Sequence, residues 1–419
     1  MGKRTLSRNT APLFPEHPQD EHKWRVDRAR KMMQADNLDV LLLARNVNVF
    51  YMTGSRFVFV GMDAPNSLAP QSTAIITADA DIYCQRFGMF DSDEVPLHTT
   101  WSESIELYDD EIELVHILKD YGVGAGARIG TEWGPSLCVG INPIKFLTLK
   151  EKVYSELGAE IVDGTRTFWK VTSIKSPLEI GRMKVAVRAA ACAMERIYDV
   201  IHVGMTELEV KRLASLFMME EGAENITHAQ VMAEGEQGLS FWSCDALDRV
   251  IEKGWVHLDL GAKYKRYGSD INRGIFLGRE PTKDEVKLYE CRRGVNDILD
   301  QIIKPGVSFD DALVSVQSYV EGQGCLLKKM GGDLFLGHGI GLEPYQRPNL
   351  VPSWAQPEFK NEEGKILFQP GMMFTYEMVV ELPHANVTAF FNVEDDVVVT
   401  ETGVENMNAM LSRDLRVKL

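Results

Sequence analysis

The spacing of apolar residues in the first part of the chain predicts helices and strands in alternation. Apolar residues recur at helical spacing over Glu21–Gln34, and the continuous apolar run Asp39–Ala44 is typical of a short buried strand. Two further strand-like runs, Thr73–Thr77 and Asp81–Phe87, are separated by turn-prone residues. A helix over ELVHILKDYG and a strand over ARIGTEW follow. The alternation predicts an α/β domain.

A change of pattern before Pro177 marks the start of a second domain. The segment Arg166–Pro177 breaks the alternation, and proline is favoured in the first turn of a helix. Three Ser/Thr-x-x-acid sequences precede apolar-periodic runs and predict helix N-termini, at Thr206, Thr282 and Ser308. Strand-like blocks lie between or after these helical runs, at 255–264, 269–278, 371–382 and 388–400. We therefore expect a polar tail over residues 1–20, an α/β domain over 21–170 and an α+β domain over 175–419.

The glycine-rich sequence GVGAGARIG, at Gly122–Gly130, has a superficial likeness to a dinucleotide-binding loop. That loop follows a strand and opens a helix, whereas these glycines precede a predicted strand. We expect an ordinary loop at the end of a helix.

Composition and charge narrow the classes of function. Hydrophobic residues make up 45% of the chain and charged residues 25%, as in an average soluble globular protein. The 45 Lys and Arg residues against 61 Asp and Glu residues give a net charge of −16, which predicts no nucleic-acid or membrane partner. Isolated cysteines, with no secretory signal and no long apolar run, indicate a cytoplasmic protein with reduced thiols. A small molecule or a peptide is the expected substrate.

Acidic residues inside apolar strands are the most informative feature of the sequence. Asp259 lies in WVHLDLGA and Asp270 in YGSDINRGIF. A hairpin turn centred near Tyr264 and Lys265 pairs positions whose numbers sum to 529, which places Asp259 directly opposite Asp270. Opposed carboxylates repel each other, and burying either of them unpaired is costly. We therefore expect a metal ion between them.

The same arrangement recurs near the C-terminus. Glu377 lies in MMFTYEMVV and Glu394 in FFNVEDDVVV, and these positions sum to 771 across a second predicted hairpin with the loop PHANV. His338 lies between the two hairpins in GHGIG, where glycines let the backbone pack closely around it. Four carboxylates and one imidazole suit two divalent ions such as Mn, Fe, Co or Zn. Two such ions can activate a bridging water and polarise a carbonyl together.

Several sequences resemble the motifs of one enzyme family, the pita-bread metallohydrolases, which include methionine aminopeptidase, aminopeptidase P, prolidase and creatinase. HLDLGAKYKRYGSDINRGIF resembles the first metal motif, GHGIGLEPYQRP the histidine motif, and GMMFTYEM and NVEDDVVVTETG the two glutamate motifs. KVTSIKSPLEIGRMKVAVRAA resembles the start of the catalytic domain. The first half resembles the N-terminal domain of the creatinase and prolidase branch, so the likeness covers nearly the whole chain after Glu21.

The resemblance implies a creatinase-like α/β N-terminal domain, a pita-bread α+β catalytic domain and a homodimer. It implies two divalent ions held by five ligands, which are Asp259, Asp270, His338, Glu377 and Glu394, and a catalytic role for His338 and Glu377. In the creatinase branch a loop of the partner subunit closes the active site. Arg56, in the loop Tyr51–Asp63, either clamps a substrate carboxylate in that way or is a solvated surface residue.

Two histidines that hold the peptide bond in family peptidases have no counterpart here. The first would precede Asp259, at a position occupied by Trp242 or Ser243, and the second would follow the histidine motif, where this chain has Tyr345 and Gln346. We expect Trp242, Tyr345 and Gln346 to contact the substrate. Trp242, Tyr345 and Tyr376 either line a pocket for a small cationic substrate or pack the cavity wall. These differences argue against ordinary Xaa-Pro cleavage.

Three classes of function remain open. The first is a metal-dependent hydrolase acting on a C–N bond of a small substrate or an Xaa-Pro peptide. The second is a metal-assisted lyase acting on a small zwitterion such as dimethylsulfoniopropionate, although the catalytic aspartate of that relative would fall at Pro344. The third is a binding protein that has lost catalysis. Because all five ligand positions are kept, we expect an enzyme, and a hydrolase in particular.

Overall fold

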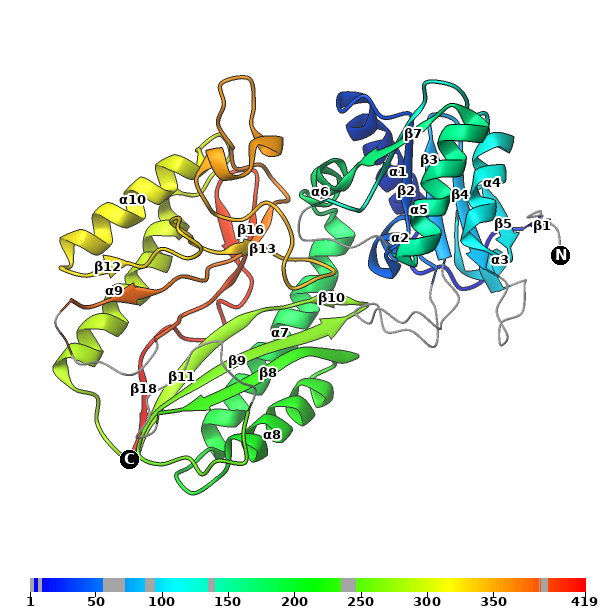
Figure 1. Ribbon diagram of the computed structural model, residues 1–419. Coiled ribbons are helices and arrows are strands. Elements are labelled where there is room, and N and C mark those ends of the chain that lie inside the picture. The colour runs from blue at the N-terminus through cyan, green and yellow to red at the C-terminus, as the bar shows by residue number, and fades with distance from the viewer. Residues whose placement is uncertain are drawn as a thin grey trace. The chain divides into compact units, whose positions relative to one another are not determined.

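The computed structural model describes residues 4–6, 10–55, 72–86, 95–134, 140–234, 246–383, 385 and 391–419. The chain divides into two compact units, Met1–Thr172 and Ser173–Leu419 (Figure 1). Each unit has its own sheets and its own apolar core.

A seven-stranded mixed sheet forms the centre of the first unit, with the order β1-β5-β4-β3-β2-β6-β7. Its strands are β1 (Arg4–Leu6), β2 (Val40–Leu43), β3 (Ser72–Thr77), β4 (Asp81–Arg86), β5 (Ser104–Tyr108), β6 (Arg128–Thr131) and β7 (Glu160–Asp163). The strands expected from the apolar runs are confirmed as β2, β3 and β4. Every residue of β2 is buried, as expected for a central strand covered on both faces.

Helices cover both faces of this sheet (Figure 1). They are α1 (Gln19–Ala35), α2 (Asn46–Thr53), α3 (Val95–Thr99), α4 (Leu114–Asp120), α5 (Pro143–Lys152) and α6 (Thr165–Thr172), with a 3-10 turn (Glu111–Glu113) and a π-helical turn (Val153–Leu157). Ile117 of α4 and Leu149 of α5 pack in one apolar cluster with Val40 and Leu42 of β2. The expected break over Arg166–Pro177 is wrong in its first half, because α6 buries Phe168 and Val171 on one side of a regular helix.

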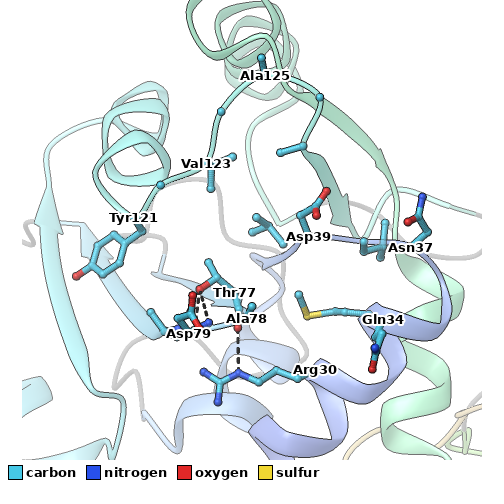
Figure 2. A pocket seen from close by; sticks show the side chains of 18 of the residues that line it. Arg30, Gln34, Asn37, Asp39, Thr77, Ala78, Asp79, Tyr121, Val123 and Ala125 are labelled. Atoms are coloured by element: carbon cyan, nitrogen blue, oxygen red, sulfur yellow. Dashed lines mark hydrogen bonds between the residues drawn. The ribbon is translucent and has the colours of Figure 1, made fainter.

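The glycine-rich loop confirms the simpler interpretation of its sequence. It joins α4 to β6, and Gly122 and Gly126 have φ values of +81° and +84°, a left-handed conformation that glycine adopts without strain. The loop lines a surface pocket of about 1120 Å³ together with the end of α1 and the turn between β3 and β4 (Figure 2). Arg30 closes one side of this pocket, where its Nε donates to the Thr77 carbonyl at 2.9 Å.

The described residues of the second unit form three sheets. The first has the order β10-β9-β11-β18 with β8 also paired to β9, the second has the order β13-β14-β16-β17, and β12 pairs with β15. Their strands are β8 (Asn225–Ala233), β9 (Gly254–Tyr264), β10 (Tyr267–Gly268), β11 (Ile271–Leu277), β12 (Leu326–Leu327), β13 (His338–Gly339), β14 (Met373–Thr375), β15 (Val380–Glu381), β16 (Asp396–Val399), β17 (Val404–Asn406) and β18 (Arg416–Lys418). Sequence analysis missed β8.

The helices of the second unit are α7 (Pro177–Val200), α8 (Glu207–Glu220), α9 (Lys283–Ile302) and α10 (Phe309–Gly322), with 3-10 turns at Ser353–Ala355 and Pro357–Phe359. The three predicted N-termini are confirmed: Thr206 and Thr282 form capping boxes, and the Ser308 hydroxyl accepts a hydrogen bond from the Asp311 amide at 3.1 Å. Within the described residues, no helix combines the length and the apolar character that crossing a membrane requires.

The two faces of β9 have different partners. Val256, Leu258 and Leu260 pack in one apolar cluster with α7 and α8. Because side chains alternate along a strand, the residues between them, including Asp259, point to the opposite face. The helices thus cover one face of β9, and Asp259 lies on the opposite face.

Candidate metal centre

The β9–β11 hairpin brings Asp259 and Asp270 together, but not directly opposite each other. Its turn is at Lys265 and Arg266, which have φ values of +47° and +71°. The two residue numbers of each β9–β11 pair sum to 531, so Asp259 is opposite Asn272. Continuing the same register places Asp270 level with Gly261. The predicted register was therefore wrong by two residues. Since a shift of two keeps every side chain on its face, the two carboxylates are still diagonal neighbours on one face.

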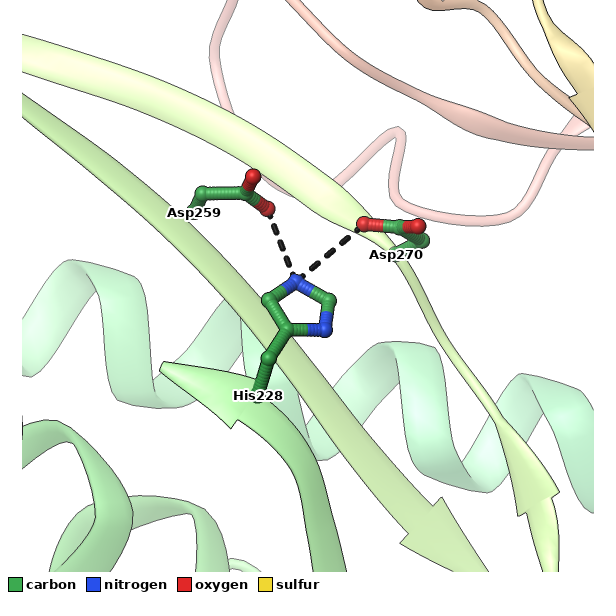
Figure 3. Close-up of side chains that lie close together, drawn as sticks. All are labelled: His228, Asp259 and Asp270. Atoms are coloured by element: carbon green, nitrogen blue, oxygen red, sulfur yellow. Dashed lines mark hydrogen bonds and ion pairs between the residues drawn. The ribbon is translucent and has the colours of Figure 1, made fainter. Parts of the chain in front are cut away.

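A third strand adds an imidazole that sequence analysis missed. β8 pairs with β9 so that His228 is opposite Gly261. Its Nε2 lies 2.9 Å from Oδ1 of Asp259 and 3.2 Å from Oδ1 of Asp270 (Figure 3). No local sequence signal points to His228, because only the pairing of β8 with β9 brings it to the acids.

The second acidic pair has the predicted register. Paired positions of β14 and β16 sum to 771, and the next pair along, Tyr376 and Asp395, follows the same register. Regular strand ends at Thr375, so the expected strand over 371–382 is split into β14 and β15. Glu377 and Glu394 lie just beyond the paired region. Glu394 forms a bridge to Asn272 of β11 instead, which connects the two sheets.

His338 reaches this pair from the neighbouring strand. β13 pairs with β14 so that His338 is opposite Thr375. Nδ1 of His338 lies 3.0 Å from the Gly339 carbonyl oxygen, which only accepts, so Nδ1 carries the proton and Nε2 presents a lone pair. Nε2 lies 3.6 Å from Oδ2 of Asp270 and 3.5 Å from Oε2 of Glu377. A histidine that donates its other ring nitrogen to a carbonyl is the usual form of a metal-binding histidine.

Two overlapping sets of side chains could hold a metal ion. One set is His228, Asp259 and Asp270, the other is Asp270, His338 and Glu394, and the donor atoms of each set lie within 4.8 Å of one another. Nε2 of His338 and Oε2 of Glu377 are buried and make no hydrogen bond within the described residues. Unpartnered buried atoms of this kind are costly without a ligand. The residues therefore fit a pair of divalent ions.

Buried polar contacts hold the two glutamates in place. Thr375 Oγ1 donates to Oε1 of Glu394 at 2.7 Å, and Asn392 Nδ2 donates to Oε2 at 3.2 Å. Arg292 of α9 is fully buried and donates to the carbonyl oxygens of Tyr376 and Met378 at 2.8 and 3.1 Å, on either side of Glu377. The backbone that carries Glu377 is thus anchored on both sides of that residue.

The acids and imidazoles shift one another's pKa values. Burial, followed by the charge of Asp270, raises the pKa values of Glu377 and Glu394 well above the usual value for glutamate. Burial also opposes ionisation of Asp259, but the attraction and hydrogen bond of His228 outweigh it and lower the Asp259 pKa. Burial lowers the pKa of His228, yet Asp259 and Asp270 outweigh this effect and raise it overall. An excess of buried negative charge is typical of a site built around cations.

The metal-free Glu377→Gln variant is expected to be more stable than metal-free wild type at pH 8, with a difference that shrinks as the pH falls toward 5. The Glu377 pKa is raised on folding, so the folded chain holds a proton that the unfolded chain releases above about pH 4.3. The stability of wild type therefore falls as the pH rises above about 4.3 toward the raised pKa of Glu377. Glutamine at the same position stays neutral. Denaturant unfolding in EDTA between pH 5 and 8 measures the difference. The exposed Glu401→Gln is the control, and a gain independent of pH would contradict the expectation.

The structure describes some, but not all, of the residues expected to contact the substrate. The Tyr345 ring lies over His338 with 4.1 Å between ring centroids, at the edge of the site. Gln346 instead packs its amide against Gly341, where an added Cβ would lie 2.2 Å from Oε1. Tyr376 is fully buried in the apolar core, so a role in lining a substrate pocket is wrong. Trp242 and Arg56 lie outside the described residues.

Comparisons with known proteins agree with this architecture. Residues 181–401 match the model of metallopeptidase family M24, and residues 25–168 match the creatinase/prolidase N-terminal domain. An uncharacterized peptidase, YqhT, of Bacillus subtilis is 26% identical over 90% of this chain and 96% of its own length. A Xaa-Pro dipeptidase of Pyrococcus furiosus is 25% identical over 92% of this chain and 97% of its own length.

Solved structures show the same fold. A Xaa-Pro dipeptidase from Bacillus anthracis matches with a TM-score of 0.74 at 23% identity, covering 95% of this chain and 100% of that one. Zinc-substituted aminopeptidase P of E. coli matches with a TM-score of 0.72 at 18% identity, covering 95% of this chain and 96% of that one. The family match spans more than half of the chain and includes the clustered acids and His338. This chain is therefore a member of metallopeptidase family M24, a metal-dependent hydrolase with a creatinase/prolidase N-terminal domain.

Proposed function

We propose that this protein uses two divalent ions to hydrolyse a C–N bond in a small substrate that carries a carboxylate. The observation that supports the proposal most strongly is the pair of donor sets that share Asp270. Oxygen donors with imidazole nitrogen suit Mn, Fe, Co or Zn. We assign the two ions to Asp259, Asp270, His338, Glu377 and Glu394, with one carboxylate oxygen of Asp270 facing each set.

The protein's own groups have distinct roles in this proposal. Two bound ions supply an activated water and polarise the scissile carbonyl. Oε2 of Glu377 is buried beside His338 and has no hydrogen-bond partner in the described part of the chain, so it is placed to accept the proton of the attacking water. The Gly339 carbonyl fixes the His338 ring so that Nε2 points to the site.

Two observations support the proposed substrate class: the names of the relatives, and the residues at the site that differ from those of family peptidases. Relatives named Xaa-Pro dipeptidase make dipeptides with a second-position proline the first compounds to test. Tyr345, which covers His338, and Gln346 stand where family peptidases have a His-Glu pair. We therefore propose that a small acid other than an Xaa-Pro dipeptide is the preferred substrate. Closure of the site by Arg56 of a partner subunit in a homodimer remains part of the same proposal.

A mass-spectrometric screen in H₂¹⁸O tests both the reaction and the substrate. Protein loaded with Mn, Co or Zn is incubated with Gly-Pro, Ala-Pro, guanidino acids, ectoine and sulfonium or ammonium zwitterions. We expect one compound to gain a single ¹⁸O in its product carboxyl or carbonyl, and Xaa-Pro turnover to stay well below about 10 s⁻¹, the median kcat of enzymes.

Each alternative gives a different result in this screen. An unsaturated product without ¹⁸O would show elimination and support the lyase. Gly-Pro turnover near the median kcat would show that Tyr345 and Gln346 do not exclude dipeptides, and the substrate proposal would be wrong. Tight metal binding without turnover of any compound would favour the binding protein.

A further inference from the structure

We propose that His228 is a sixth metal ligand, so that the ion held by Asp259 and Asp270 has an imidazole of its own. This inference rests on the proposed dinuclear site. The five assigned ligands include one nitrogen donor, His338. With His228 added, each of the two ions has one imidazole.

The first argument is the distance between donor atoms. Nε2 of His228 lies 2.9 Å from Oδ1 of Asp259 and 3.2 Å from Oδ1 of Asp270, and Figure 3 shows the ring aimed between the two carboxylates. Donor atoms bound to one octahedral ion at about 2.1 Å are separated by about 3 Å. The imidazole nitrogen therefore lies at the spacing of one coordination sphere from each of the two oxygens.

The second argument is the space that the fold leaves for the ring. His228, Gly261 and Asp270 lie at one level across three neighbouring strands, so His228 and Asp270 flank the glycine. A Cβ at Gly261 would lie 2.5 Å from Cε1 and 2.7 Å from Nδ1 of His228. The ring thus occupies the position of the missing side chain. Any larger residue at 261 would keep the imidazole away from the acids.

The third argument is competition for the same oxygen atoms. The two oxygens that His228 contacts belong to the donor set for the first ion. When that ion binds, His228 leaves these oxygens, stays as a hydrogen-bonding neighbour of the coordinated carboxylates, or joins them as a ligand. Its side chain is only 24% exposed and packs over Gly261, which argues against withdrawal of the ring from the acids.

Metal titration tests the assignment. Metal-free wild type, His228→Ala and His228→Gln are titrated with Co²⁺ by calorimetry, with the exposed His202→Ala as the matched control. We expect two ions per chain in wild type and in the control. In both His228 variants one ion should bind more than ~100-fold more weakly, since loss of a partner outside the coordination sphere typically costs only ~10- to 100-fold. Circular dichroism and thermal unfolding confirm that the metal-free variants are folded.

An NMR count of coordinated imidazoles separates a ligand from a hydrogen-bonding neighbour. In ¹⁵N-histidine-labelled protein loaded with Co²⁺, direct coordination gives a large paramagnetic shift of the ring nitrogens. We expect two such histidines in wild type and one in His228→Gln. One shifted histidine in wild type would overturn the inference while leaving the proposed function intact. Failure of wild type to bind two ions would instead overturn the proposed function itself.

Discussion

Asp270→Asn is expected to remove both ions from the loaded protein and to lower kcat/KM at least ~1000-fold. Asp270 belongs to both donor sets, with Oδ1 3.2 Å from His228 and Oδ2 3.6 Å from His338. Asparagine keeps the shape but replaces one anionic oxygen with a donor amide. The stabilisation of transition-state charge by metal ions is several kcal/mol, and about 4 kcal/mol corresponds to ~1000-fold in rate. Elemental analysis after dialysis and kinetics on the substrate found by the screen measure the two effects.

The same substitution should change stability in opposite directions with and without metal. In metal-free protein the charge of Asp270 raises the pKa values of Glu377 and Glu394, which reflects repulsion among the buried acids. Removing that charge should raise the melting temperature in EDTA. With Mn²⁺ or Co²⁺ present, wild type gains binding free energy that the variant lacks, so the variant should melt at a lower temperature. The exposed Asp199→Asn should show neither change, and equal melting curves under both conditions would exclude Asp270 as a ligand.

The elements that sequence analysis located are those specified by local chemistry. α8 and α9 begin directly after their N-cap residues, Thr206 and Thr282, because each capping box is completed within four residues. β2 follows from a continuous apolar run. Each of these signals is contained in a few neighbouring residues and does not depend on contacts with distant segments.

Hairpin register depended on the exact place of a turn. The β9–β11 turn lies at Lys265 and Arg266, two residues with positive φ and no glycine or asparagine to mark it. Asp259 and Asp270 were nevertheless assigned to the same face of the hairpin, because a register shift of two residues leaves every side chain on its original face. The alternation of side chains could also have placed Tyr376 away from the site, since its neighbour Glu377 faces His338 and adjacent side chains on extended backbone point to opposite sides.

His228 could not be found from local signals. Within the described residues, β8 pairs with β9 alone, and it mixes polar with apolar residues, which makes its strand pattern weak. Its link to Asp259 depends on pairing across a separation of 31 residues. Gly261 was a clue, because a glycine inside a strand often marks a close approach, but a single sequence does not say what approaches it.

Asp395→Ala is expected to destabilise the second unit by about 3–5 kcal/mol, the usual cost of breaking a buried ion pair by removing one partner. Asp395 is fully buried and accepts hydrogen bonds from Arg273 at 2.6 Å and from Arg413 at 2.7 Å. Burial opposes its ionisation, but these two guanidinium groups outweigh burial and lower the Asp395 pKa. Without the carboxylate, Arg273 keeps a buried charge whose remaining partners are backbone carbonyl groups, including that of Glu394.

For a unit of this size the loss corresponds to a fall in melting temperature of roughly 6–20 °C. Thermal unfolding of metal-free Asp395→Ala measures this fall in melting temperature directly. Omitting the metal separates the effect of the substitution on folding from any effect on metal binding. Asp414→Ala is the matched control, because its side chain is 79% exposed and lies 3.7 Å from Arg293, so it should change stability by less than ~0.5 kcal/mol. Asp395→Asn should recover part of the loss, since an amide oxygen still accepts from Arg273. If Asp395→Ala is no less stable than the control, the buried pair does not hold the segment that carries Glu394, and other contacts, such as those of Thr375 and Asn392, position that carboxylate.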